Sequence, residues 1–230
     1  KKFPECYIAF QLEQTVSTRW FSEIQIEKLK NSLLILDYSL DNIKYLSNSI
    51  PISNLYYLPI STIALKDKDT PYEYDILFYG DTNNDRRKAY INEISKYFKV
   101  KIVNNSFGEN IWEYIKKSKI VLNIHYYENA LLETTRIYEC LSNDALIISE
   151  KSSDFNTYTD LENIVDFVEI DNIQEMIDRI NFWLNESTEF IERKKLIKSY
   201  NQRNETQFDF YFHRMLLSLD IIDFDTMYNN

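Results

Sequence analysis

The chain has 230 residues, of which 44% are hydrophobic and 15% aromatic, so it can bury a substantial core. Its formal net charge of -10 argues against binding to nucleic acid or to an anionic membrane surface, since both require clustered Lys and Arg. No apolar run reaches the roughly 18 residues of a membrane span, and no secretion signal is recognisable, so we expect a cytoplasmic protein. Because the sequence begins at Lys1 rather than Met, we expect it to be a piece of a longer polypeptide.

The first part of the chain alternates short apolar runs with helical patterns. The predicted strands are Tyr7–Leu12, Leu33–Tyr38 and Asn54–Ile60. The predicted helices are Ser22–Asn31 and Ser39–Ser47, the second opened by Ser39 as a good N-cap. The run Lys66–Pro71 is polar and ends in proline, which predicts a linker.

The second part of the chain repeats the alternation more regularly. The predicted strands are Tyr74–Tyr79, Lys99–Val103, Ile120–Ile124, Ala145–Ser149 and Ile164–Glu169. The predicted helices are Asp85–Phe98, Asn110–Lys117 and Leu131–Ser142, followed by helices over most of Ile173–Leu219 and a frayed tail, Asp220–Asn230. Strands and helices at this spacing predict βαβ units and a parallel α/β sheet.

Ligands of parallel α/β sheets bind beyond the carboxyl ends of the strands, here at three loops: Gly80–Asn84, Asn104–Glu109 and His125–Ala130. Gly80 and Gly108 are the only glycines, so the sequence has no glycine-rich phosphate loop. Phosphate groups would have to be bound by helix N-termini and side chains. Cys6 and Cys140 match no metal-binding spacing, and we predict no metal site.

Each polar cluster near these loops has a structural alternative. Arg86 and Arg87 follow Gly80 at a helix start, where they can also be ordinary solvated side chains. Glu133, Arg136 and Glu139 are spaced three residues apart, which also suits surface ion pairs. His125 stands at a strand end where ligands bind, although a lone histidine is more often structural than catalytic. For His213, in an aromatic C-terminal helix, packing is the better interpretation.

The order of three segments, "DILFYG…RR", "SKIVLNIHYYE" and "LETTRIYECLSNDALIISE", resembles the C-terminal domain of GT-B glycosyltransferases, in particular the CgeB-like and the family 1- or family 4-like groups. Arg136, Glu139, Leu141 and Ile147-Ile148 match the family pattern. Asn143 replaces its usual glycine and also tolerates a left-handed backbone. The first glutamate of the family 4 E-x7-E motif would fall on Leu131, so that contact is absent or supplied elsewhere.

The resemblance implies a Rossmann-like sheet of GT-B type with a partial N-terminal α/β domain. Residues 1–65 would be an acceptor-side segment, 66–72 a linker, 73–204 the donor-binding domain, and 205–230 a crossover helix and tail. The apolar side chains of that helix are expected to pack back onto Tyr7–Ile60.

The same resemblance implies a glycosyltransferase that uses a nucleotide-diphosphate sugar as donor and needs no cofactor or metal. Glu139 would accept hydrogen bonds from the ribose hydroxyls, Arg136 would bind the pyrophosphate, and Gly80 would let backbone amides approach it. The helix that follows Ile124 would add the positive end of its dipole. The remaining expected donor-binding residues are Asp81, Arg86, His125 and Tyr126. Glu13 and His125 are the candidates for catalytic residues, and the acceptor, whether glycan, protein or lipid, is not defined.

Two other functions remain open at this stage. A non-catalytic GT-B-like module that binds a nucleotide or glycan is favoured by the missing first glutamate and the partial N-terminal domain. A flavodoxin-like or receiver domain is a weaker alternative, because the loop after Tyr79 lacks a receiver's acidic pocket.

Overall fold

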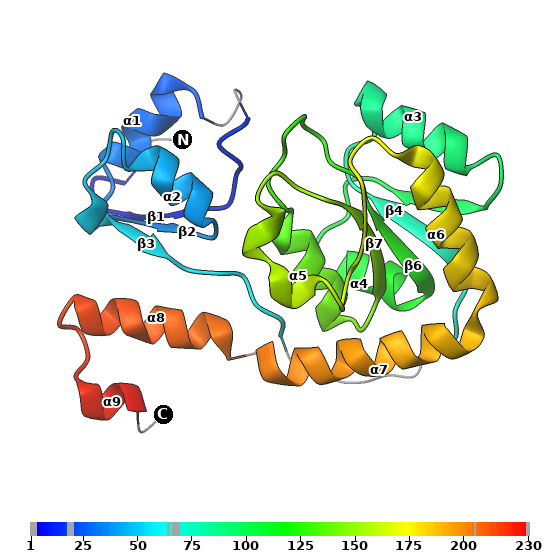
Figure 1. Cartoon of the computed structure of the whole chain (residues 1–230). Coiled ribbons are helices and arrows are strands. Elements are labelled where there is room, and N and C mark those ends of the chain that lie inside the picture. The colour runs from blue at the N-terminus through cyan, green and yellow to red at the C-terminus, as the bar shows by residue number, and fades with distance from the viewer. Residues whose placement is uncertain (1–3, 18–20, 64, 66–69, 205, 229–230) are drawn as a thin grey trace. The chain divides into compact units, whose positions relative to one another are not determined.

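The computed structural model describes residues 4–17, 21–63, 65, 70–204 and 206–228. The chain divides into two compact units (Figure 1). Unit 1 comprises Lys1–Ser61 and Thr206–Asn230, and unit 2 comprises Thr62–Glu205. Residues 66–69 of the predicted linker lie outside the described residues. Within the described part of the chain, we find no helix with the length and apolar character to cross a bilayer.

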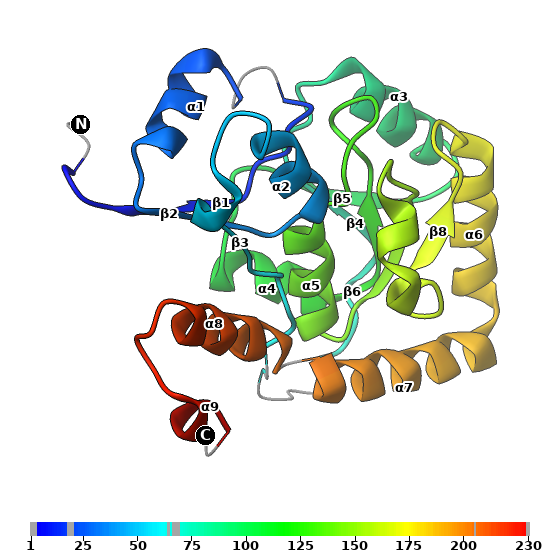
Figure 2. The same ribbon diagram turned by 60° about the vertical axis from the view of Figure 1, so that its left-hand side comes forward.

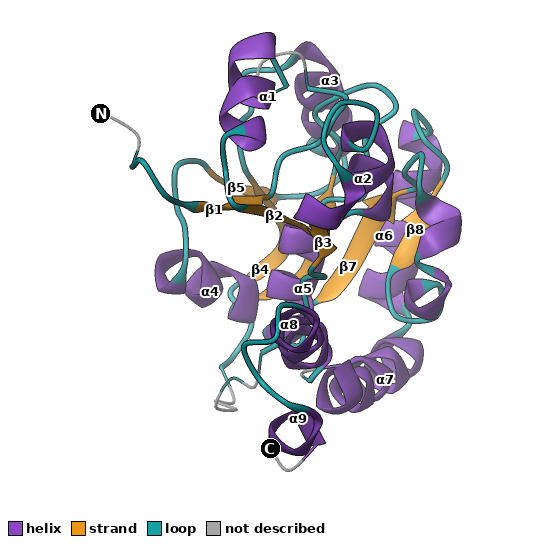
Figure 3. Ribbon diagram, turned by 90° about the vertical axis from the view of Figure 1, so that its left-hand side faces the viewer, coloured by secondary structure: helices purple, strands orange, loops and turns teal. Residues whose placement is uncertain are grey.

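Unit 1 contains a small parallel sheet in the order β1-β2-β3 (Figure 3), formed by Ile8–Gln11, Leu34–Asp37 and Leu55–Tyr57. Helices α1 (Glu23–Lys30) and α2 (Leu40–Leu46) connect the strands. Ser39 caps α2 as predicted, since its hydroxyl accepts a hydrogen bond from the Asn42 amide. One core of this unit lies between β2 and α2 and includes Ile35 and Leu46, both almost fully buried.

Helix α8 (Gln207–Ser218) completes unit 1 from the far end of the chain. The buried Met215 packs with Leu36 and Leu58, and Phe208, Phe212 and Leu219 pack against the same cluster. This confirms the expected docking of the C-terminal helix onto the N-terminal segment. The two sequence segments share this apolar cluster, so Leu36 and Leu58 depend on α8 for their cover.

The predicted frayed tail is wrong in part, because Phe224–Tyr228 forms a short helix, α9. Its start is fixed by Asp223, whose carboxylate accepts a hydrogen bond from the Thr226 amide at 2.8 Å. The rings of Phe224 and Tyr228 stack one turn apart with centroids 6.1 Å apart. Residues 229–230 lie outside the described residues.

Unit 2 is built on a five-stranded parallel sheet in the order β5-β4-β6-β7-β8, which confirms the predicted α/β class. In chain order its strands are β4 Tyr74–Tyr79, β5 Val100–Val103, β6 Ser118–Asn123, β7 Leu146–Glu150 and β8 Asp166–Val168. Its helices are α3 Asp85–Ile94, α4 Glu109–Lys116, α5 Thr134–Ser142, α6 Ile173–Asn185 and α7 Ser187–Asn204. Short 3-10 turns at Phe155–Thr157 and Thr159–Leu161 connect β7 to β8.

The helices cover both faces of this sheet, with α3 and α6 on one side and α4 and α5 on the other (Figures 1 and 2). Strands covered on both faces must be apolar along most of their length. The continuous apolar runs of β4, β6 and β7 meet this requirement, and nearly all their residues are buried. Helix α7 packs against α5, α6 and β7.

Two sequence predictions in unit 2 are corrected by its tertiary contacts. Helix α5 begins at Thr134 rather than Leu131, because the Leu132 amide is bound by the Asp154 carboxylate at 2.9 Å. The left-handed residue after this helix is Asp144 (φ 53°), whereas Asn143 keeps a negative φ. Asp, like Asn, tolerates this conformation, and the left-handed position lies one residue later than expected.

Candidate functional site

The site lies where the parallel strands of unit 2 end, because their adjacent carboxyl ends bring their loops together. Asn84 connects the loops after β4 and β6, since its amide donates to the Tyr126 carbonyl at 3.1 Å. Asn104 connects the loops after β5 and β4 by donating to the Thr82 hydroxyl at 3.3 Å. The three predicted loops therefore form one surface.

Gly80, directly after β4, stands beside two guanidinium groups. Its φ of +128° is a conformation that L side chains rarely adopt. A Cβ at this position would lie 2.9 Å from Nη2 of Arg136 and 3.5 Å from Nη1 of Arg87. The absence of a side chain thus leaves room for two cations that converge on the same point of the backbone.

Arg87 and Arg136 are held in place by strand-end acceptors. Arg87 donates from Nε to the Ile124 carbonyl at 2.9 Å, and Arg136 donates from Nη1 to the Asn123 side chain at 2.8 Å. Burial, and next the charge of Arg136, lower the pKa of Arg87 to about 10, so that it remains protonated at neutral pH. The buried Nε of Arg136 has no partner among the described residues.

His125, which is fully buried, pairs with the partly buried Glu133 beside these two arginines. Nδ1 of His125 is 2.7 Å from a carboxylate oxygen of Glu133, and Nε2 is 3.0 Å from the Lys151 carbonyl. Both partners are acceptors, so both ring nitrogens carry hydrogen when both bonds form. Burial lowers the pKa of His125, but the charge of Glu133 offsets this effect, and the pKa lies above its usual value.

Glu133 in turn faces several donors. Burial raises the pKa of Glu133, but the charge of His125 and then of Arg136 and Arg87 lower it by more, so this carboxyl stays ionised. It also accepts a hydrogen bond from Asn123 at 3.0 Å and lies 3.8 Å from Arg87. When His125 is protonated, the cluster of Arg87, Arg136, His125 and Glu133 carries more positive than negative charge.

Glu139, one turn beyond Arg136 on α5, has an oriented carboxylate. One oxygen accepts from the Tyr79 hydroxyl at 2.9 Å and the other from the Trp112 indole at 3.0 Å. Burial raises the pKa of Tyr79 well above its usual value, so the phenol stays a donor. Each carboxylate oxygen has a second lone pair that can accept a further hydrogen bond.

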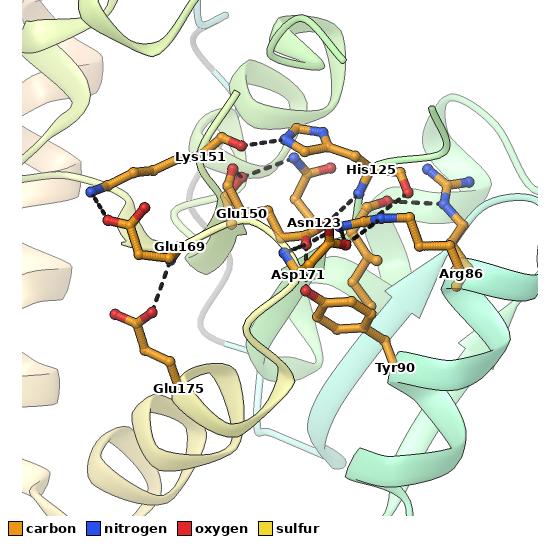
Figure 4. A network of polar contacts seen from close by, with 12 residues as sticks. Arg86, Tyr90, Asn123, His125, Glu150, Lys151, Glu169, Asp171 and Glu175 are labelled. Atoms are coloured by element: carbon orange, nitrogen blue, oxygen red, sulfur yellow. Dashed lines mark hydrogen bonds and ion pairs between the residues drawn. The ribbon is translucent and has the colours of Figure 1, made fainter. Parts of the chain in front are cut away.

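Arg86 lies in a network of polar contacts at the strand ends (Figure 4). It contacts both oxygens of the fully buried Glu150, and it donates to Asp171 at 2.7 Å and to the His125 carbonyl at 3.0 Å. Glu150 also accepts from the Tyr90 hydroxyl and from the backbone amides of His125 and Asp171. The donors of Arg86 are directed at protein acceptors, and the pair ties α3 to the ends of β6 and β7.

The remaining predicted site residues, Asp81, Tyr126 and Glu13, belong to different units: two are in the strand-end loops of unit 2 and one is in unit 1. Asp81 is exposed and accepts from the Asn83 amide at 2.7 Å, which shapes the loop after β4. The Tyr126 ring lies 5.2 Å from the Arg87 guanidinium. Glu13 belongs to unit 1, where its carbonyl accepts from Asn42 at 2.8 Å.

Sequence reasoning missed the site roles of Arg87, Asn123, Glu133 and Trp112. Asn123 had a usable signal, because a polar residue that ends an apolar run such as "IVLN" stands where a parallel strand meets its loop. Arg86 and Arg87 could not be told apart, since helix periodicity alone does not say which of two neighbours turns towards the strand ends. Trp112 gave no signal, because its contact depends on how α4 packs beside α5.

The chain was compared with known proteins. The model of a family described as glycosyl transferase-like matches residues 63–215. A search of curated protein sequences finds no significant match. Similar solved structures include TarM of S. aureus, with a TM-score of 0.64 at 11% identity, covering 84% of this chain and 45% of TarM.

Two further structures resemble this chain over most of its length. HepE from Anabaena, solved in complex with UDP-glucose, has a TM-score of 0.60 at 11% identity, covering 94% of this chain and 72% of HepE. Sucrose-phosphate synthase from Thermosynechococcus elongatus has a TM-score of 0.57 at 12% identity, covering 93% of this chain and 68% of that one. This chain therefore spans less than half of TarM and about seven tenths of HepE.

These three proteins are GT-B glycosyltransferases, and at such low identity the likeness concerns the fold. It confirms the expected Rossmann-like architecture of GT-B type. The family model covers well over half of the chain and includes every strand and helix that carries the site. The protein therefore belongs to the glycosyl transferase-like family and has the GT-B fold.

Proposed function

We propose that unit 2 binds a nucleotide-diphosphate sugar and that the protein transfers the sugar to an acceptor. The observation that carries the proposal is the convergence of Arg87 and Arg136 on Gly80, beside the oriented carboxylate of Glu139. Two adjacent guanidinium groups repel each other, and a doubly charged group such as a diphosphate relieves that repulsion. The complex of HepE with UDP-glucose supports a uridine nucleotide as the first donor to test.

In this proposal each group binds one part of the donor. Arg136 and Arg87 bind the pyrophosphate, and the bare backbone at Gly80 lets it approach closely. Glu139 uses its remaining lone pairs to accept from the ribose hydroxyls, with Tyr79 and Trp112 holding the carboxylate in place. Asp81 and Tyr126 line the same loops and stay candidates for donor contacts.

The proposed chemistry is stabilisation of the departing nucleotide diphosphate. Negative charge develops on the diphosphate as the bond to the sugar breaks, and two fixed cations stabilise it without a metal ion. His125 acts as a positioning residue in this scheme, because both its ring nitrogens face protein acceptors. Glu13 remains the candidate for a catalytic base from unit 1.

Calorimetry with UDP and with uridine tests the assignment. We expect Glu139→Ala to weaken both ligands about 10- to 150-fold, because hydrogen bonds to a charged partner contribute about 1.5–3 kcal/mol. Glu139→Gln should have a smaller effect, since its amide oxygen still accepts. Arg136→Lys should weaken UDP more than uridine, because lysine cannot form the bidentate contact.

The matched control is Glu192→Ala, which removes an exposed carboxylate of α7 that pairs with Lys195 at 2.7 Å. It should leave both affinities unchanged. Repeating the titrations with EDTA should not alter UDP binding, and a collapse on chelation would refute metal independence. If Glu139→Ala bound UDP like the wild type, the donor assignment would fail. If UDP bound but the complete protein neither hydrolysed nor transferred UDP-sugars, the non-catalytic module would be the better description.

A further inference from the structure

Unit 2 carries a hollow of about 540 Å³ beside the edge strand β5. Its walls include the side chains of Tyr74, Asn105, Ser106, Asn110, Glu113 and Tyr114. The volume lies within the range of about 300–1,000 Å³ that is typical of small-molecule sites. None of these residues belongs to the donor-binding set proposed above.

The hollow faces away from the donor side of α4. Asn110, Glu113 and Tyr114 are three and four residues apart, so they share one face of this helix. Trp112, which donates to Glu139, is rotated by more than a quarter turn from each of them. A ligand in the hollow therefore does not compete with the group that holds Glu139.

Two aromatic rings form one wall of the hollow. Tyr74 and Tyr114 stack with centroids 6.3 Å apart and planes at 30°. The Lys101 ammonium lies 5.2 Å from each centroid and holds the pair together through cation–π contacts. The wall is thus formed before any ligand arrives, which reduces the entropy lost on binding.

The other walls present the carboxylate of Glu113 and several neutral hydrogen-bonding groups. In the described part of the chain, the side chains of Asn105, Ser106 and Asn110 have no hydrogen-bond partner, and neither do the two tyrosine hydroxyls. Lys117, which also lines the hollow, is already paired with Glu73 at 3.0 Å. An anion would find no cluster of unpaired cations here, and an apolar ligand would leave the side-chain amides without hydrogen bonds. A polyhydroxylated ring can both pack on the tyrosine rings and form hydrogen bonds with the amides.

We propose that this hollow is a carbohydrate-binding site that holds one ring of an oligosaccharide apart from the donor site. The C–H face of the sugar packs on the tyrosine pair, and its hydroxyls exchange hydrogen bonds with the amides of Asn105 and Asn110. Such a site would retain a glycan by a ring that does not react. The inference rests on the hollow alone and stands whether or not unit 2 binds a nucleotide.

The test is an NMR titration of the ¹⁵N-labelled chain with maltotriose, cellotriose and chitotriose. At least one trisaccharide should shift the amides of residues 105–114, and saturating UDP should not displace it. Tyr114→Ala should weaken binding at least about 10-fold and Asn110→Ala roughly 3- to 10-fold. The control Tyr97→Ala removes an exposed tyrosine outside the hollow and should bind like the wild type.

Three results would overturn the proposal: no shift with any trisaccharide, equal binding by Asn110→Ala and the wild type, or displacement by UDP. Asn110 is exposed, so its variant remains informative even if Tyr114→Ala folds poorly. Failure of the donor assignment looks different, because it abolishes UDP binding and leaves the trisaccharide shifts intact.

Discussion

Asp37, at the end of β2, is a fully buried carboxyl group with one oxygen satisfied and one not. Oδ1 accepts from the Ser39 amide at 2.9 Å and from the Asn42 side chain at 3.0 Å, while Oδ2 has no partner among the described residues. Burial raises the pKa of Asp37 to about 7, against the opposing effect of these two hydrogen bonds. The folded protein therefore binds this proton more tightly than the unfolded chain does.

This difference fixes the sign of a pH effect. Stability due to protonated Asp37 is fully present below the unfolded pKa of about 4, and it is lost as pH rises through the folded pKa. Asp37→Asn cannot ionise and keeps the accepting oxygen. We expect the wild type to lose up to a few kcal/mol relative to Asp37→Asn between pH 5 and pH 8. Urea unfolding of both proteins at the two pH values measures this, and parallel pH dependences would contradict it.

Gly80 offers a second prediction at the residue scale. Gly80→Ala places a methyl group 2.9 Å from the Arg136 guanidinium in an unfavourable backbone conformation. We expect a loss of about 1–3 kcal/mol in stability and weaker UDP binding. Gly108→Ala is the matched control, because its φ is also positive but nothing lies within 4 Å of the added Cβ. It should lower stability and spare UDP binding, so equal affinities in the two variants would refute the role of Gly80.

At this scale the sequence predicted which loops carry the candidate side chains, but not which contacts those side chains make. Gly80, Arg136 and Glu139 lie where the strand-end argument and the family resemblance place them. The spacing of Glu133, Arg136 and Glu139 also suited a stripe of surface ion pairs, but the Glu133 carboxylate turns inward to His125 and Asn123. Such a contact joins α5 to β6, and no local spacing encodes it.

At the scale of elements, Glu150 connects four parts of unit 2. Its carboxylate joins the end of β7 to α3, to the His125 amide after β6 and to the Asp171 amide before α6. Glu150→Ala leaves Arg86 without its buried partner and should lower stability by about 3–5 kcal/mol. Glu169→Ala removes the exposed partner of Lys151 and should change the stability of the protein by less than about 1 kcal/mol. Chemical unfolding compares them, and equal losses would argue against a structural role for Glu150.

The strands of unit 2 were predictable because they are continuous apolar runs, a pattern that is typical of strands covered on both faces. Element ends were less predictable, as α5 illustrates. Its residue pattern is helical from Leu131, but Asp154, from a distant loop, binds the Leu132 amide before the helix starts. The last predicted helical stretch also divides into α6, α7 and α8, and α8 belongs to the other unit.

At the scale of the whole molecule, unit 1 depends on both ends of the chain. A protein truncated after Asn204 would lack Met215 and the aromatic side chains that cover Leu36 and Leu58. We expect hydrogen exchange to speed up in β1–β3 and to remain slow in β4–β8, with a lower melting temperature for unit 1. Unchanged protection of β2 would show that α8 contributes little to its stability.

The ends of unit 2 meet, and this bears on the order of folding. The Thr62 hydroxyl donates to the Asn201 carbonyl at 3.2 Å, and the Thr62 amide donates to the Asn204 side chain at 3.3 Å. Once unit 2 has folded, the two segments of unit 1 emerge from neighbouring points. The loop-closure entropy for joining α8 to β2 has then already been lost in folding unit 2. During synthesis, more than a hundred residues must therefore follow β3 before Met215 can pack against Leu36 and Leu58.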